Sequence, residues 1–95
     1  MISRGCVKFE SAEIAYLYHA DMIQKWGDRT NGGVHGLAVD GCYVALDTLG
    51  SDDDVGGLLH EHASHWASEH NAGHVERVRV GMQSDRMSFW VRLIE

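Results

Sequence analysis

The sequence predicts an α+β domain in which two helices pack on one face of a mainly antiparallel sheet, in the order β-α-ββ-α-ββ. Two segments, 12–26 and 52–72, repeat their apolar residues with the period of a helix. The shorter segments around them have the alternation or the turn residues of strands and hairpins. A chain of 95 residues supports one modest core. Residues 1–95 are therefore expected to form a single compact domain.

The first strand and the first helix follow from the N-terminal quarter of the chain. Residues 5–10 alternate, with Val7 and Phe9 on one side and Cys6, Lys8 and Glu10 on the other. The helix predicted over 12–26 has an unusually wide apolar arc, because Tyr16 and Ile23 extend past the face that one small sheet covers. The polar, glycine-rich segment 27–33 is predicted to be a connection.

Two hairpins are predicted from turn residues. Asp40-Gly41 lies between the apolar runs 37–39 and 42–46, and this dipeptide favours a two-residue turn with both central residues at positive φ. At the C-terminus, segments 75–82 and 87–94 alternate and are separated by four residues of turn-forming composition. Their pairing would complete the sheet.

The second helix contains most of the chemistry-bearing side chains. The acidic run 52–54 predicts its start, since carboxylates are favourable at a helix N-terminus, and Asn71-Ala72-Gly73 predicts its end near Ala72. The helical period places one set of residues on the buried arc, namely Val55, Leu58, Leu59, His62 and Trp66. It directs another set away from the core, namely His60, Ser64, Ala67 and Asn71.

Charge and composition limit the function classes. The formal net charge of −6 disfavours direct nucleic-acid or anionic-membrane binding, which need surplus Lys and Arg. The two cysteines, Cys6 and Cys42, have no second pair nearby and are interpreted as buried thiols. No long apolar run or secretion signal is recognisable, so a cytoplasmic location is expected.

A metal site is one hypothesis for the second helix. His62, His65 and Glu69 lie along one side of it and could bind zinc with a fourth ligand from elsewhere, as in a zinc-dependent hydrolase. The competing interpretation, which we favour, buries His62 in the helix interface with one hydrogen bond and pairs His65 with Glu69. It leaves His60, His70 and His74 solvated. No nucleophile or oxyanion donor is identifiable, so catalytic residues are not assigned.

The sequence favours a small acidic, non-enzymatic binding protein of inhibitor or adaptor type, with no cofactor. It would dock on a larger protein with a basic surface, for example a nucleic-acid-handling machine. Arg77, Arg79, Arg92 and Trp90 are predicted on the outer face of the C-terminal hairpin. A homodimer is compatible with this exposed aromatic surface. The predicted partner-binding residues are Tyr16, Trp26, Asp52, Asp53, Asp54, Arg79 and Trp90.

Overall fold

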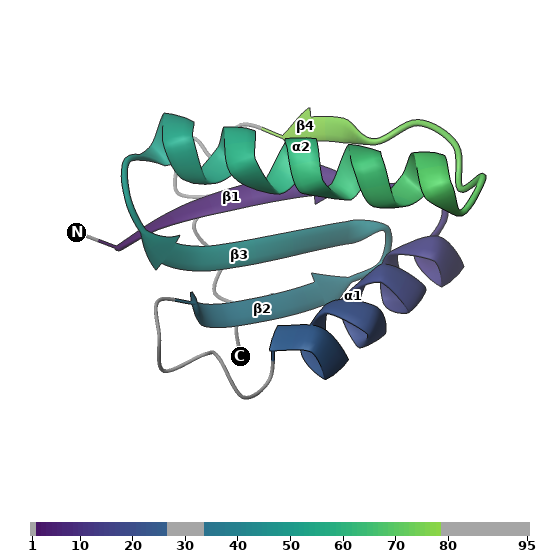
Figure 1. The fold of residues 1–95 in the computed structure, drawn as a ribbon, viewed down its shortest axis with the longest axis horizontal. Helices are drawn as coiled ribbons and strands as arrows, with labels where there is room; N and C mark the ends of the chain where they lie inside the picture. Colours follow the sequence, from purple (N-terminus) through teal and green to yellow (C-terminus); the bar gives the residue numbers. More distant parts are fainter. Residues whose placement is uncertain (1, 27–33, 79–95) are drawn as a thin grey trace.

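A computed structural model describes residues 2–26 and 34–78 of the chain. Its elements are β1 (Ile2–Lys8), α1 (Ala12–Trp26), β2 (Val34–Asp40), β3 (Tyr43–Leu49), α2 (Asp52–Glu69) and β4 (Glu76–Val78). The strands form one antiparallel sheet in the order β2-β3-β1-β4, and Figure 1 shows both helices on the same face of it. The predicted α+β class and helix placement are confirmed. The second arm of the predicted C-terminal hairpin, 87–94, and the connection 27–33 lie outside the described residues.

Strand β1 lies inside the sheet and carries apolar side chains on both faces. Val7 faces the helices and belongs to the main core, together with Phe9, which follows the strand. Cys6 pairs with Ala45 on β3 and with Val78 on β4, and these side chains lie on the other face of the sheet. The predicted alternation of this segment is confirmed. Neither described helix is long and apolar enough to cross a membrane.

Helix α1 packs on the sheet through a narrow face and leaves several large apolar side chains exposed. Ala15, Tyr18 and Met22 are fully buried. In contrast, Tyr16 is 53% exposed, Leu17 58% and Ile23 44%. The predicted excess of apolar surface on this helix is therefore confirmed.

Helix α2 begins where the acidic run predicts and ends three residues before the predicted stop. Ser51 is the N-cap, and its side chain accepts a hydrogen bond from the Asp54 amide at 3.1 Å. At the other end, Asn71 rather than Gly73 is the first residue with positive φ, at 51°. The Ala72 amide donates to the Ala67 carbonyl at 2.8 Å, and the Asn71 amide donates to the Ser68 carbonyl at 3.5 Å. These bonds form a Schellman motif, which closes the helix at Asn71.

The buried face of α2 differs from the predicted arc. Leu58 is 61% exposed, whereas Ala67, predicted to point away, is only 1% exposed. The cause is a close approach between α2 and β1, because a Cβ on Gly5 would lie 2.8 Å from the Gly56 Cα atom. Gly56, Ala63 and Ala67 are small and buried, and they allow this approach. Compared with the predicted arc, the helix is therefore rotated about its axis so that these small residues face the sheet.

The β2–β3 turn is displaced by one residue from the prediction. Asp40 pairs with Tyr43, so the two loop residues are Gly41 and Cys42. Gly41 has φ of +58°, while among the described non-glycine residues only Asn71 has positive φ. A glycine at the first central position, with a single positive φ, is the pattern of a type II′ turn. In such a turn Gly41 takes the one position that requires a positive φ, and Asp40 remains in the strand, paired with Tyr43.

Candidate functional site

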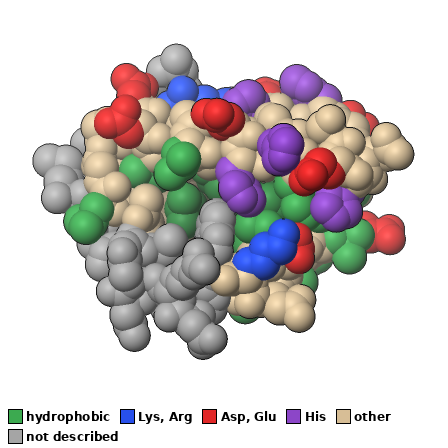
Figure 2. Space-filling view, viewed as in Figure 1, with side chains coloured by type: hydrophobic (Ala, Val, Ile, Leu, Met, Phe, Trp, Pro, Cys, Tyr) green, Lys and Arg blue, Asp and Glu red, His purple; other side chains and the backbone are tan. Residues whose placement is uncertain are grey.

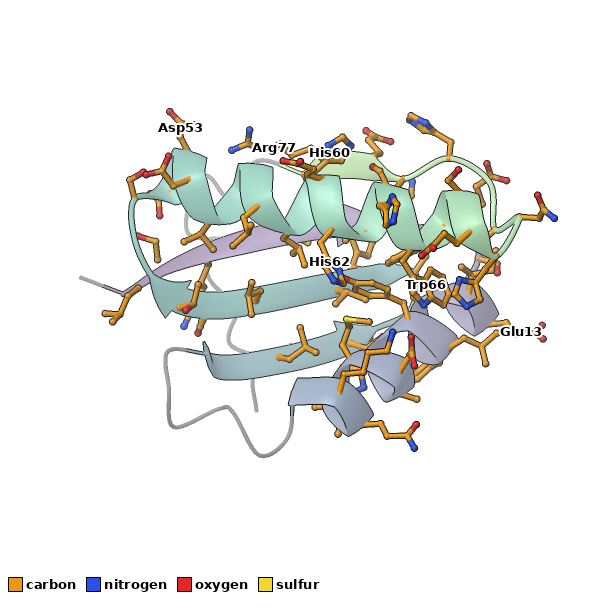
Figure 3. All side chains as sticks on the ribbon, viewed as in Figure 1. Glu13, Asp53, His60, His62, Trp66 and Arg77 are labelled. Atoms are coloured by element: carbon orange, nitrogen blue, oxygen red, sulfur yellow. The ribbon has the colours of Figure 1, made fainter. Side chains whose placement is uncertain are left out.

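The three predicted metal ligands lie on one helix but have different environments. Figure 3 shows His62 pointing from α2 toward α1, where its Nδ1 atom lies 2.9 Å from the Tyr18 hydroxyl. His65 and Glu69 are exposed and form an i, i+4 pair with Nε2 and Oε1 3.6 Å apart. Within residues 2–26 and 34–78, no three His, Cys, Asp or Glu side chains are placed to hold a metal ion. These contacts agree with the interpretation that His62 lies in the interface between the helices and that His65 pairs with Glu69.

The expectation that the remaining histidines of this region are solvated is wrong for His60, which is partly buried, whereas His70 is exposed but still makes specific contacts. The His60 Nε2 atom lies 3.0 Å from the Val75 carbonyl, which ties α2 to the segment entering β4. His70 stacks on Trp66 with centroids 4.3 Å apart, and its Nδ1 donates to the Trp66 carbonyl at 2.8 Å. The side chain of His74 is exposed. The two missed partners are backbone carbonyls, which a residue pattern does not reveal.

The hydrogen bond between Tyr18 and His62 joins the two helices inside the core. Burial, reinforced by the charge of Asp21, raises the pKa of Tyr18, so its hydroxyl stays protonated and the tautomer of His62 decides which of the two groups donates. Desolvation lowers the pKa of His62, and the charges of Lys25 and His65 act in the same direction while Asp21 opposes them. His62 is therefore neutral in the folded protein at neutral pH.

Stability is expected to fall on acidification in the window between the His62 pKa of the unfolded chain, about 6.5, and its lower pKa in the folded chain. In this window the unfolded state binds more protons, so the free energy of unfolding decreases as the pH decreases. His62→Gln, which keeps an acceptor for Tyr18, should show a shallower pH dependence in denaturant titrations. An unchanged slope in this variant would assign the effect to other groups.

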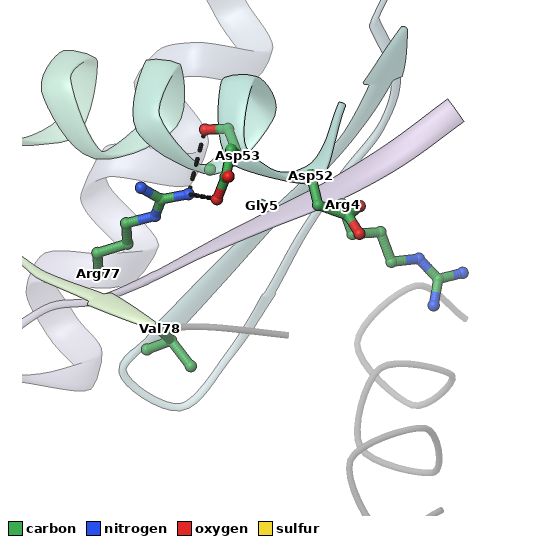
Figure 4. Close-up of a pocket in the computed structure, with 7 residues that line it drawn as sticks. Arg4, Gly5, Asp52, Asp53, Arg77 and Val78 are labelled. Atoms are coloured by element: carbon green, nitrogen blue, oxygen red, sulfur yellow. Dashed lines mark hydrogen bonds and ion pairs between the residues drawn. The ribbon is translucent and has the colours of Figure 1, made fainter. Parts of the chain in front are cut away.

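The acidic run at the start of α2 is exposed and interacts with β4. The Asp53 carbonyl accepts a hydrogen bond from the Arg77 Nη2 atom at 3.1 Å, and its carboxylate lies 3.6 Å from the same atom (Figure 4). The prediction that Arg77 lies on the outer face of the sheet is wrong. The side chain of Val78 lies on the outer face, next to Cys6. Because successive side chains of a strand point to opposite faces, Arg77 points toward α2.

The negative charge of the described residues is concentrated on α2. This helix has five carboxylates and no Lys or Arg, and Figure 2 shows acidic and histidine side chains gathered over it. The basic residues of the described part each have a neighbour: Arg4 with Asp47 at 3.0 Å, Lys25 with Asp21 at 3.3 Å, Arg77 with Asp53 at 3.6 Å, and Lys8 over the Tyr43 ring at 5.8 Å. On the outward side of α2, Asp54, Glu61 and Glu69 are exposed beside Leu58.

A groove of about 400 Å³ lies between α1 and the C-terminal end of α2. It is lined by Ile14, Leu17, Asp21, Trp66, His70, Asn71 and Ala72. The Trp66 indole donates to the Asp21 Oδ2 atom at 2.9 Å. Desolvation acts to raise the pKa of Asp21, but the hydrogen bonds from Trp66 and Lys25 and the charges of Lys25 and His70 outweigh it. The net effect lowers this pKa, so the carboxylate is ionised.

The predicted partner-binding residues do not form one surface within the described part of the chain. Tyr16 is exposed on α1, whereas Asp52, Asp53 and Asp54 occupy the end of α2 that lies away from α1 in Figure 1. Trp26 is the last residue of α1, and its side chain is outside the described part. Arg79 and Trp90 are also outside it. Sequence reasoning missed the groove, although the i, i+3 spacing of Ile14 and Leu17 was a signal for one of its walls.

Neither protein-family models nor curated proteins nor solved structures give a match to this chain. The candidate surfaces are therefore interpreted from their own contacts, burial and charge. Two of them differ in chemistry: the acidic outward side of α2, and the apolar groove beside its C-terminal end.

Proposed function

We propose that this protein is a small non-enzymatic docking protein, of inhibitor or adaptor type, which binds a basic surface on a larger protein through the outward side of α2. The supporting observation is the segregation of charge, since α2 has five carboxylates and no Lys or Arg. A phosphate-binding groove of a nucleic-acid-handling protein is a surface of matching chemistry. A complementary potential of this kind increases the association rate and suppresses wrong partners.

The arrangement of side chains on α2 suits a docking face. Asp54, Leu58, Glu61, His65 and Glu69 follow one another at spacings of three or four residues, so they share one side of the helix. Leu58, 61% exposed, provides an apolar contact among the carboxylates. The helix is held from behind by its buried face and capped at both ends. The partner would therefore meet a preformed surface and little ordering entropy would be lost on binding.

Charge-neutralising variants test this proposal. The double variant Asp54→Asn/Glu61→Gln removes two charges from the docking face, and Glu13→Gln/Glu76→Gln removes two exposed charges from other elements. A partner isolated by crosslinking in the host lysate should bind the first variant roughly tenfold more weakly, a change of about 1.4 kcal/mol. The salt dependence should also be smaller. The control variant should bind the partner with the affinity of the wild type. Added DNA or RNA should compete with this protein for the basic surface of the partner.

Equal affinities and salt slopes for the two double variants would contradict the proposal. A crosslinked partner with an acidic contact surface would also contradict it, because charge complementarity is the basis of the assignment.

A further inference from the structure

We propose that the groove between α1 and the C-terminal end of α2 is a second binding site, separate from the acidic side of α2. The geometry points to one kind of occupant: a segment of a protein that presents an aliphatic side chain next to a lysine or arginine. The apolar lining, the free hydrogen-bond acceptors and the helix end each contribute to this assignment.

The lining of the groove suits an aliphatic side chain. Ile14 and Leu17 come from α1, and Trp66 and Ala72 come from α2 and the residues after it. Leu17 is 58% exposed, so a partner side chain can cover it, whereas Trp66 is only 6% exposed and is a rigid wall. Burying an aliphatic side chain against these groups is favourable because it removes apolar surface from water. The volume of about 400 Å³ is sufficient for a few side chains.

The polar groups of the groove are acceptors, and they select for a donor. Both contacts of the ionised Asp21 carboxylate, with Trp66 and with Lys25, use Oδ2, so within the described residues Oδ1 is available. The Nδ1 atom of His70 donates to a carbonyl, so in the neutral ring Nε2 is an acceptor, and no hydrogen bond uses it within residues 2–26 and 34–78. A lysine or arginine beside the aliphatic group would supply donors to these acceptors.

The position of the groove at the end of α2 also favours a cation. The negative end of a helix dipole attracts positive charge. The last turn of α2 contains no basic residue, and Glu69 adds a carboxylate there. Lys25 of α1 pairs with the Asp21 Oδ2 atom at 3.3 Å, so a partner cation would join this pair, while α2 itself contributes no Lys or Arg to its last turn.

The same features argue against a second copy of the chain as the occupant. A copy would bring a formal net charge of −6 to a site that already presents an ionised carboxylate and a helix C-terminus. An acidic peptide would be disfavoured for the same reason.

The test uses three short synthetic peptides. One has two leucines flanked by lysines, one has the same leucines flanked by glutamates, and one has the lysines with glycines in place of the leucines. Affinities are measured by fluorescence anisotropy in about 0.15 M salt, where the Debye length is about 8 Å and distant charges contribute little. The indole N–H resonance of Trp66 reports contact with the groove.

A matched pair of leucines provides the control variants. Leu17 lines the groove and is 58% exposed, while Leu58 is 61% exposed on the outward side of α2. Leu17→Gln should weaken the lysine–leucine peptide at least fivefold, and Leu58→Gln should leave its affinity unchanged. Asp21→Asn keeps an acceptor for the Trp66 indole but removes the charge, and it should weaken this peptide more than threefold.

The expected result is that only the lysine–leucine peptide binds and shifts the Trp66 indole resonance. Equal binding of the glutamate–leucine peptide, equal losses in the two leucine variants, or no binding of any peptide would overturn the assignment. Asp54→Asn/Glu61→Gln should bind the peptide like the wild type. Failure of the groove assignment and failure of the proposed docking function are therefore distinguishable.

Discussion

Gly5→Ala is expected to destabilise the fold by roughly 2–3 kcal/mol, at the upper end of the range for overpacked cores. The added Cβ would lie 2.8 Å from the Gly56 Cα atom and 2.9 Å from the Val55 carbonyl oxygen. Both neighbours are backbone atoms of α2, so no side chain can rotate away to make room. The helix would have to move off β1, and the contacts of Val55 and Leu59 with the core would loosen. Denaturant titrations at fixed pH measure the change.

Gly57→Ala is the matched control for this prediction. Among the described residues its Cβ would meet only the Arg77 Nη1 atom, at 3.9 Å, an ordinary contact distance. Because alanine is favoured over glycine in helices by up to about 1 kcal/mol, this variant should be as stable as the wild type or more stable. Equal destabilisation by the two substitutions would show that α2 is not seated on β1 through Gly5.

Trp66→Ala is expected to have the largest effect on stability, a loss of about 3–5 kcal/mol. The indole packs edge-on against Phe9, with centroids 6.1 Å apart, and against Tyr18, with centroids 5.2 Å apart. Truncation would also remove the donor to Asp21 and the stacking surface of His70. A domain of this size has a free energy of unfolding of about 5–15 kcal/mol, so a loss of this size would remove between about a fifth and all of it.

Thermal and denaturant unfolding of Trp66→Ala should be compared with those of Leu58→Ala. Leu58 is on the same helix but is 61% exposed, and its truncation should change the free energy of unfolding by about 0.5 kcal/mol or less. A loss below about 1 kcal/mol in Trp66→Ala would mean that the aromatic cluster is not the centre of the core.

Local signals in the sequence predicted the elements and their order well. The acidic run after Ser51 marks the start of α2, because capping and dipole effects depend only on neighbouring residues. The alternation in β1 and the wide apolar arc of α1 were also interpreted correctly. Errors of one to three residues occurred at the β2–β3 turn and at the end of α2, where Gly41 and Asn71 take the positive φ values.

Features that depend on the approach of distant segments could not be predicted from periodicity. The contact between Gly5 and Gly56 rotates α2, exposes Leu58 and buries Ala67, and nothing local to the helix indicates that contact. The orientation of Arg77 and the groove beside Trp66 likewise depend on how β4 and α1 meet α2. The acidic character of α2, by contrast, is visible in its composition alone.

The two thiols differ in access, and this difference provides an intrinsic chemical reporter. Cys6 is buried within the sheet, whereas Cys42 is partly accessible in the β2–β3 turn. A maleimide dye should therefore attach first at Cys42 in the hairpin. Modification of Cys6 would require the packing around it on the outer face of the sheet, against Ala45 and Val78, to open, so its slow kinetics would time that local opening under native conditions.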